Sequence, residues 1–106
     1  MSIMALELRP NCEYCDRDLP ADSPEARICS YECTFCASCV EGVLDNVCPN
    51  CGGGFEPRPI RPQREWRPGL SLAKRPASTK RHRMRYQRQE VEELSRLVRD
   101  LPPPTR

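Results

Sequence analysis

The sequence predicts a small metal-stabilised α+β domain over residues 1–56, followed by a largely disordered tail with one short helix. Two observations predict this. All eight cysteines of the 106-residue chain lie between Cys12 and Cys51. Residues 1–56, the head, hold three basic and ten acidic residues, a net charge of −7, whereas residues 57–106, the tail, hold fourteen basic and five acidic residues, a net charge of +9. With 12 prolines and 6% aromatic residues, the chain lacks the core for an ordinary enzyme cleft, so we expect no enzyme.

The cysteines form four closely spaced pairs. Two residues separate the members of three pairs, and three residues separate the members of the fourth. A two-residue gap lets a tight turn direct both sulfurs toward one zinc ion, and the glycines at 52–54 suit such a turn after the last pair. Four pairs predict two zinc sites, with the ligands Cys12, Cys15, Cys29, Cys33, Cys36, Cys39, Cys48 and Cys51. Because two closed sites use all eight thiols, neither zinc would keep an open position for catalysis.

The head has few apolar residues besides its cysteines. A core of this size supplies at best roughly 3–5 kcal/mol, whereas a structural zinc site can contribute about 10–16 kcal/mol of apparent binding energy that is also folding energy. We therefore expect the head to be unfolded without metal.

The expected compartment is the reducing cytoplasm. The start of the chain lacks the basic and apolar regions of a secretory signal peptide, and no apolar run is long enough to cross a membrane. In that compartment an even number of cysteines is better interpreted as metal ligands than as disulfides.

Iron is the main alternative to zinc. The run Cys33-x2-Cys36-x2-Cys39 reproduces part of a bacterial ferredoxin motif, but eight residues rather than three precede the next cysteine. The sequence Cys48-Pro-Asn-Cys51-Gly resembles a rubredoxin turn, where iron can replace zinc in the same four-sulfur geometry. An iron–sulfur or rubredoxin-like redox protein is therefore a distant alternative.

Three local elements are predicted in the head. Residues 22–24, Asp-Ser-Pro, indicate a turn, and residues 26–31 a short strand. Residues 37–45 predict a short helix that buries Val40, Val43 and Leu44 at helical spacing and ends at Asn46.

The tail begins with a predicted basic linker at residues 57–82. Its alternating arginine and proline favour an extended backbone over packed structure. Residues 74–88 contain seven basic residues and no acidic one, a composition that can attract nucleic acid, with Trp66 and Tyr86 able to stack on bases. Alternatively, the basic tail docks on the acidic head, which would weaken any binding of nucleic acid.

An amphipathic helix is predicted at residues 83–101, followed by a C-terminal tail at residues 102–106 that starts with three prolines. Its apolar stripe follows a heptad, broadened by Leu97, with the seam residues Met84, Gln87, Val91, Leu94, Val98 and Leu101. This pattern suits a partner-binding or weakly dimerising helix, and the oligomeric state stays open. His82 lies in a basic segment away from the cysteines, so we expect it to be exposed and not a ligand.

The order of gaps between the cysteines resembles a RING finger with cysteine at the usual histidine position, Cys33. Phe35, Val40 and the Pro49-Asn50 dipeptide support the resemblance. It implies a RING-like, treble-clef zinc finger in which the pairs interleave. One ion would be held by Cys12, Cys15, Cys36 and Cys39, and the other by Cys29, Cys33, Cys48 and Cys51. Spacing alone leaves open a sequential pairing that joins the first pair to the second and the third to the fourth.

The RING resemblance also raises a ubiquitin ligase-like function. Of the positions through which such ligases bind a conjugating enzyme, only Pro49 matches well: Tyr14, Val43 and Gly52 replace the usual aliphatic, tryptophan and arginine residues. A ligase is therefore a distant alternative.

A closer resemblance is to a bacterial family of short eight-cysteine proteins, domain of unknown function 1272. The runs at 6–15, 28–36 and 47–53 carry this resemblance, which extends over about residues 5–62. It implies a bacterial zinc-binding module without an assigned activity. We accordingly expect a small zinc protein that serves as a protein-interaction or structural module for an unknown protein partner, with a nucleic-acid-associated factor as the alternative.

Overall fold

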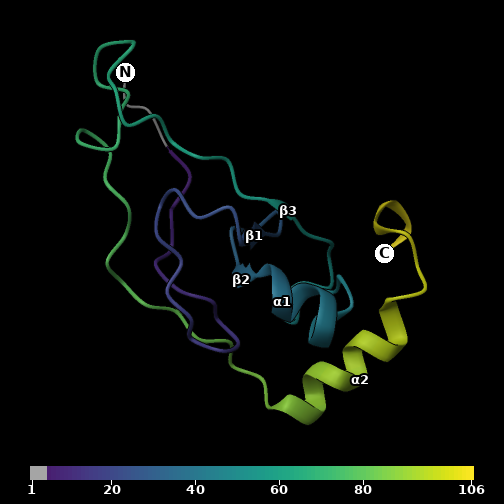
Figure 1. The fold of residues 1–106 in the computed structure, drawn as a ribbon. Coiled ribbons are helices and arrows are strands. Elements are labelled where there is room, and N and C mark those ends of the chain that lie inside the picture. Colours follow the sequence, from purple (N-terminus) through teal and green to yellow (C-terminus); the bar gives the residue numbers. More distant parts are fainter. Residues whose placement is uncertain (1–4) are drawn as a thin grey trace.

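The computed structural model describes residues 5–106, and its first part is a small three-stranded sheet with a helical segment beside it (Figure 1). None of the helices in the described range is long and apolar enough to cross a membrane. In chain order the elements are β1 (Ala26–Ile28), β2 (Thr34–Cys36), α1 (Ala37–Cys39), the π-helical turn η1 (Val40–Leu44), β3 (Glu56–Pro57), α2 (Arg88–Val98) and the 3-10 turn η2 (Pro103–Thr105).

The sheet has the order β2-β1-β3, and both pairings are antiparallel. Ala26 lies opposite Cys36 and Ile28 opposite Thr34, while Ile28 also faces Glu56 on β3. The predicted strand at 26–31 is therefore confirmed in its first half only. Its second half forms the turn into β2, where Glu32 adopts a φ of 66°.

The predicted helical segment at 37–45 is confirmed as α1 and η1, which are continuous. Val40 and Leu44 are buried, and Val43 is half-buried against the core. Asp45 and Asn46 both take left-handed φ values, 51° and 59°, which end the helical segment at the predicted place. Aspartate and asparagine tolerate this conformation better than other non-glycine residues.

The core is assembled around the cysteines. Six of the sixteen buried apolar residues between positions 5 and 106 are cysteines. Phe35 and Phe55 meet edge to face with ring centroids 5.4 Å apart, and Leu19, Leu44 and Val47 fill the remaining space. Because so much of the interior consists of thiols, packing in the head depends on what those thiols bind.

The tail packs against the head, so the expectation of a largely disordered tail is wrong for the described residues. The Arg58 side chain is buried and donates to the carbonyl oxygens of Arg9, Leu19 and Pro20. The backbone N–H of Ser78 donates to the Leu8 carbonyl at 3.0 Å. The alternative that the basic tail docks on the acidic head fits these contacts.

Helix α2 is shorter than the predicted 83–101. The backbone N–H of Met84 donates to the Glu13 carbonyl at 3.2 Å, so this residue packs on the core from an extended segment before the helix. The helix begins after Gln87, whose N–H donates to the Glu90 carboxylate at 2.8 Å. This side-chain cap satisfies a backbone donor at the helix N-terminus.

The face of α2 that packs on η1 agrees with the predicted seam at Val91, Leu94 and Val98, which are buried or half-buried, but differs from the prediction at two other positions. Val91 and Ser95 are buried, whereas Leu97 is 75% exposed. The Ser95 hydroxyl lies 3.2 Å from the Leu44 carbonyl and 3.0 Å from an Asp45 carboxylate oxygen. Ser95 can occupy a buried position because its hydroxyl forms hydrogen bonds with the carbonyl and carboxylate groups at the C-terminal end of η1.

Val91→Ala is expected to undock α2 partially. The substitution removes two buried methyl groups and should cost roughly 1–3 kcal/mol of docking free energy. Amide hydrogen exchange measures the undocking, and the amides of α2 should exchange faster in the variant. The matched control is Leu97→Ala, which truncates an exposed side chain and should leave exchange nearly unchanged. Equal effects of the two variants would contradict the observed packing of α2.

Candidate metal centre

The first cysteine group consists of Cys12, Cys15, Cys36 and Cys39, whose sulfur atoms all lie within 4.8 Å of one another. Cys12 and Cys15 belong to a tight turn before β1, Cys36 ends β2 and Cys39 ends α1. The Asp16 N–H donates to the Cys12 carbonyl at 2.9 Å, and the Cys15 N–H lies 3.5 Å from the Cys12 sulfur. Such N–H groups orient and stabilise thiolates in metal-binding turns.

The second group brings together Cys29, Cys33 and Cys48, again with all sulfurs within 4.8 Å. Cys29 follows β1 and Cys33 precedes β2, so the turn between the strands presents both thiols on one side. The Tyr31 N–H donates to the Cys29 sulfur at 3.3 Å. All three cysteines are buried.

Cys51 lies outside the second group, although it was predicted as its fourth member. It is exposed, and its sulfur accepts the Gly53 N–H at 3.4 Å. Its backbone nevertheless belongs to the same turn as Cys48, because the Gly52 N–H donates to the Cys48 carbonyl at 2.7 Å. Gly52 has a φ of 81°, which glycine adopts without strain.

The pairs interleave, as in the cross-brace arrangement and unlike the sequential one. The first and third pairs form one group, and the second pair meets Cys48 of the fourth. The strands explain this order, because β1 and β2 run antiparallel and place Cys29 and Cys33 at one end of the hairpin. Cys36 lies at the other end, next to the turn that carries Cys12.

Crowded thiols in each group cannot all ionise unless a cation is present. Hydrogen bonds from Cys33 and Cys48 lower the pKa of Cys29 to about 3. Hydrogen bonds that Cys48 makes with Cys29 and Cys33 raise its own pKa. Burial raises the pKa of Cys39, and the negative charge of Cys12 adds to this effect. A divalent ion removes this conflict, since it binds several thiolates at once.

The donors restrict which ions fit. Soft thiolate sulfur favours zinc, cuprous copper or iron over hard cations such as magnesium and calcium. The eight thiols are all free in the structure, so each can act as a ligand. The two groups can therefore hold metal ions of the soft or borderline class.

Glu13 connects the two groups and was missed by the sequence analysis. It lies inside the first cysteine turn with 5% of its surface exposed. Its carboxylate accepts the Thr34 N–H at 2.6 Å, the Arg9 guanidinium at 2.8 Å and the Asn50 amide at 3.4 Å. Since Thr34 follows Cys33 and Asn50 precedes Cys51, this carboxylate fixes the turns of both groups together. An acidic residue between two cysteines gives no sequence signal for this role.

The segment around His82 also lies closer to the first group than expected. The backbone of His82 exchanges two hydrogen bonds with the buried Asn11 side chain, at 2.8 and 3.0 Å. Its ring, 21% exposed, lies 3.4 Å from the Glu7 carboxylate. The expectation that His82 is solvent-exposed is therefore wrong, because the amide of Asn11 draws the chain onto the head.

Comparison with known proteins gives a relative and a family for this chain. An uncharacterized protein of Rhizobium meliloti (strain 1021) is 58% identical over 76 residues, which cover 72% of this chain and 83% of the relative. No solved structure matches. The family described as "Protein of unknown function (DUF1272)" matches residues 5–61, which is more than half of the chain and includes all eight cysteines. The chain therefore belongs to the DUF1272 family.

Proposed function

We propose that the head binds two structural zinc ions in a RING-like, treble-clef arrangement and serves as a protein-interaction or structural module. The observation that carries this proposal is the pair of interleaved cysteine groups, each with sulfurs within 4.8 Å of one another. In the zinc-bound protein, Cys51 would turn its side chain toward Cys48 and complete the second site. This requires rotation of the Cys51 side chain within a turn that the Cys48–Gly52 and Cys48–Gly53 backbone hydrogen bonds already form.

Zinc is favoured over iron on two grounds. The ferredoxin-like run Cys33, Cys36 and Cys39 is divided between the two groups, so it does not act as one cluster motif. Closed tetrahedral sites with four sulfurs also suit zinc as a structural ion.

An interaction role follows from the closed sites. A metal with four protein ligands has no position left for a substrate, and its contribution is to hold surface turns in place. The turn between Cys29 and Cys33 presents Tyr31, whose side chain is 72% exposed and whose N–H is fixed by the Cys29 sulfur. An exposed aromatic residue on a metal-fixed turn suits contact with a protein partner. In contrast, α2 packs on η1, the part of the head where a RING ligase would bind its conjugating enzyme, so the arrangement gives the ligase alternative no support.

Elemental analysis and an absorption spectrum of anaerobically purified protein test the proposal. The expected result is two zinc ions per chain and no visible colour. Cys12→Ser is expected to lower the content to about one zinc. Alkylation should then label Cys15, Cys36 and Cys39 well before Cys29, Cys33, Cys48 and Cys51.

Two results would overturn this assignment. Iron with acid-labile sulfide and a brown colour would indicate a redox protein instead. Labelling of Cys29 and Cys33 in the Cys12→Ser variant, while Cys36 and Cys39 stay protected, would contradict the interleaved pairing. Cys15→Ser is the companion variant, because it removes an exposed member of the same site and should give the same labelling pattern.

A further inference from the structure

Residues 61–75 form a closed basic loop at one end of the molecule, remote from α1 and α2 (Figure 1). The Leu72 N–H donates to the Pro62 carbonyl at 3.0 Å and closes the loop. The Arg61 guanidinium ties its base by donating to the carbonyls of Arg75 and Leu6. The loop is therefore a formed surface feature, of the compact kind that often carries function.

The basic loop carries positive charge that the protein itself leaves uncompensated. Its sequence holds five basic residues and one acidic residue, a net charge of +4. Among residues 5–106, Arg64, Arg67, Lys74 and Arg75 form no ion pair. Arg81, in contrast, binds Asp16 and Asp18 at 3.0 and 2.7 Å. Apart from Arg61, which donates to the Leu6 carbonyl, the arginines that hold the tail to the head are thus different from those of the loop.

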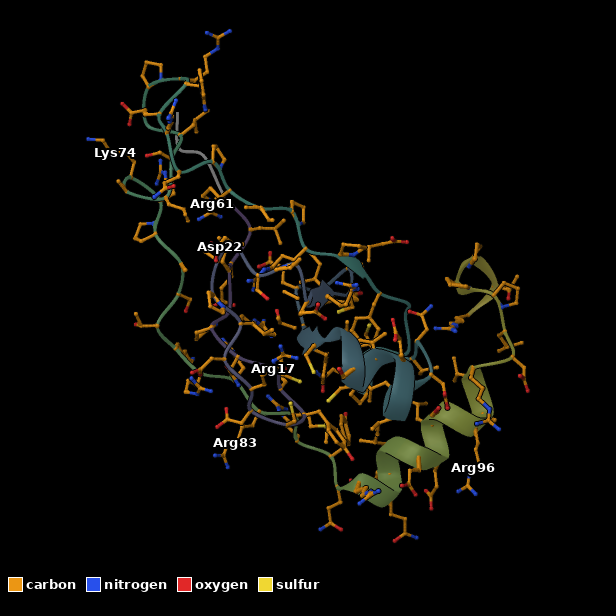
Figure 2. All side chains as sticks on the ribbon, viewed as in Figure 1. Arg17, Asp22, Arg61, Lys74, Arg83 and Arg96 are labelled. Atoms are coloured by element: carbon orange, nitrogen blue, oxygen red, sulfur yellow. The ribbon has the colours of Figure 1, made fainter. Side chains whose placement is uncertain are left out.

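A hollow of about 330 Å³ lies at the base of the loop, and its lining includes Arg61, Lys74, Arg75 and Ser78 together with Glu7. The Glu7 carboxylate is paired with Arg9 at 2.8 Å. Figure 2 shows Arg61 and Lys74 at this end of the molecule, away from Arg83 and Arg96. Three basic side chains around one hollow suit a phosphate group.

The loop also exposes the single tryptophan of the chain. Trp66 is 71% exposed, and Leu70, four positions further along the loop, is 38% exposed. An indole in water among arginines is the arrangement that stacks on nucleic-acid bases while the guanidinium groups bind phosphates. The loop contains no helix or strand that could enter a major groove, so its aromatic ring can reach only unpaired bases.

We propose that the basic loop is a binding surface for single-stranded nucleic acid, with Trp66 as the stacking residue and Arg64, Arg67, Lys74 and Arg75 as the phosphate contacts. The binding region thus shares only Lys74 and Arg75 with the run at 74–88 that the sequence favours, and excludes the rest of that run. In that run Arg81, Arg83 and Arg88 face Asp16, Asp18 and Glu92, which lowers their attraction for phosphate. The proposal is independent of the role of the zinc sites.

The test is titration of the full-length, metal-loaded protein with a fluorescein-labelled 15-nucleotide oligo-dT. Anisotropy follows the oligonucleotide, and quenching of Trp66 emission follows the loop. We expect binding that weakens steeply with salt. A triple Arg64→Ser, Arg67→Ser, Lys74→Ser variant should bind at least about tenfold more weakly, and the slope of log affinity against log salt should be smaller in magnitude by about two, since each phosphate contact on a single strand contributes about 0.7. Trp66→Leu should reduce affinity by about tenfold.

The matched control removes the same charge elsewhere, through Arg83→Ser, Arg85→Ser and Arg96→Ser, and should weaken binding less than threefold. Equal losses in the two triple variants would overturn the proposal, as would absence of binding at low salt. A blue shift of Trp66 emission with phosphatidylglycerol vesicles, without quenching by oligo-dT, would assign the loop to an anionic membrane instead. Zinc content of each variant separates these outcomes from failure of the metal site, because it should equal that of the unmodified protein.

Discussion

Removal of the proposed zinc ions with a strong chelator is expected to melt α2 together with the head, although α2 contains no cysteine. The buried side of α2 rests on η1, and η1 follows directly after Cys39 of the first group. Each structural zinc can contribute about 10–16 kcal/mol of folding energy, far more than the remaining core. Once the head unfolds, an isolated helix of eleven residues is too short to persist in water.

Far-UV circular dichroism and amide hydrogen exchange measure this loss. The helical signal should fall, and the Val91 N–H, which donates to the Gln87 carbonyl at 3.1 Å, should lose its protection. Chelator that is already saturated with zinc is the control and should change neither signal. Zinc added back under reducing conditions should restore both. Persistence of α2 protection in stripped protein would show that the tail folds without the head.

The cysteine groups are the part of the site that the sequence predicts best, and there is a physical reason for it. The members of a pair are three or four positions apart, so a single turn brings them together whatever the rest of the chain does. Which pairs meet depends on the β1–β2 hairpin, and only the RING resemblance favoured the interleaved order beforehand. The outward position of the Cys51 side chain depends on rotation about its own bonds, which spacing does not determine.

Docking of the tail was harder to predict because its contacts have no periodicity. Arg58 and Arg81 look like the other arginines of a proline-rich segment, but one binds backbone carbonyls and the other binds aspartates of the head. Apolar spacing extended the predicted helix back to Met84. The structure instead uses the N–H of Met84 for a bond to Glu13, which a helical pattern cannot reveal.

Arg58→Met is expected to destabilise the metal-loaded protein by about 2–5 kcal/mol, a large effect for a residue that the sequence places in a linker. The side chain is 4% exposed and donates to three carbonyls, at 2.8 Å to Arg9, 3.3 Å to Leu19 and 2.8 Å to Pro20. Methionine fills similar space but removes the donor that the Arg9 and Leu19 carbonyls share, while the Pro20 carbonyl keeps only the Ser23 N–H at 2.9 Å. Burial lowers the pKa of Arg58, which reflects the cost of enclosing this charge without a carboxylate partner.

The Arg58→Met substitution should destabilise the head because the three carbonyls flank the first cysteine turn. Arg9 precedes the first cysteine turn, and Leu19 and Pro20 follow it, while the Arg58 N–H donates to the Ala26 carbonyl of β1 at 3.0 Å. One residue therefore fixes the loop that carries Cys12 and Cys15 to the sheet, at whose β1–β2 hairpin Cys29, Cys33 and Cys36 lie. Loss of this link should also speed release of zinc from the first group relative to the second.

Denaturant unfolding at saturating zinc measures the stability change, and a colorimetric chelator measures the release rate. Arg64→Met is the matched control, because Arg64 is exposed and the same charge is removed without loss of a buried donor. Arg58→Lys keeps the charge but lacks the planar guanidinium that reaches several carbonyls at once. Its stability should therefore lie between those of Arg58→Met and Arg64→Met. If Arg58→Met and Arg64→Met unfold at the same denaturant concentration, the carbonyls find other donors and the arginine does not link the turn to the sheet.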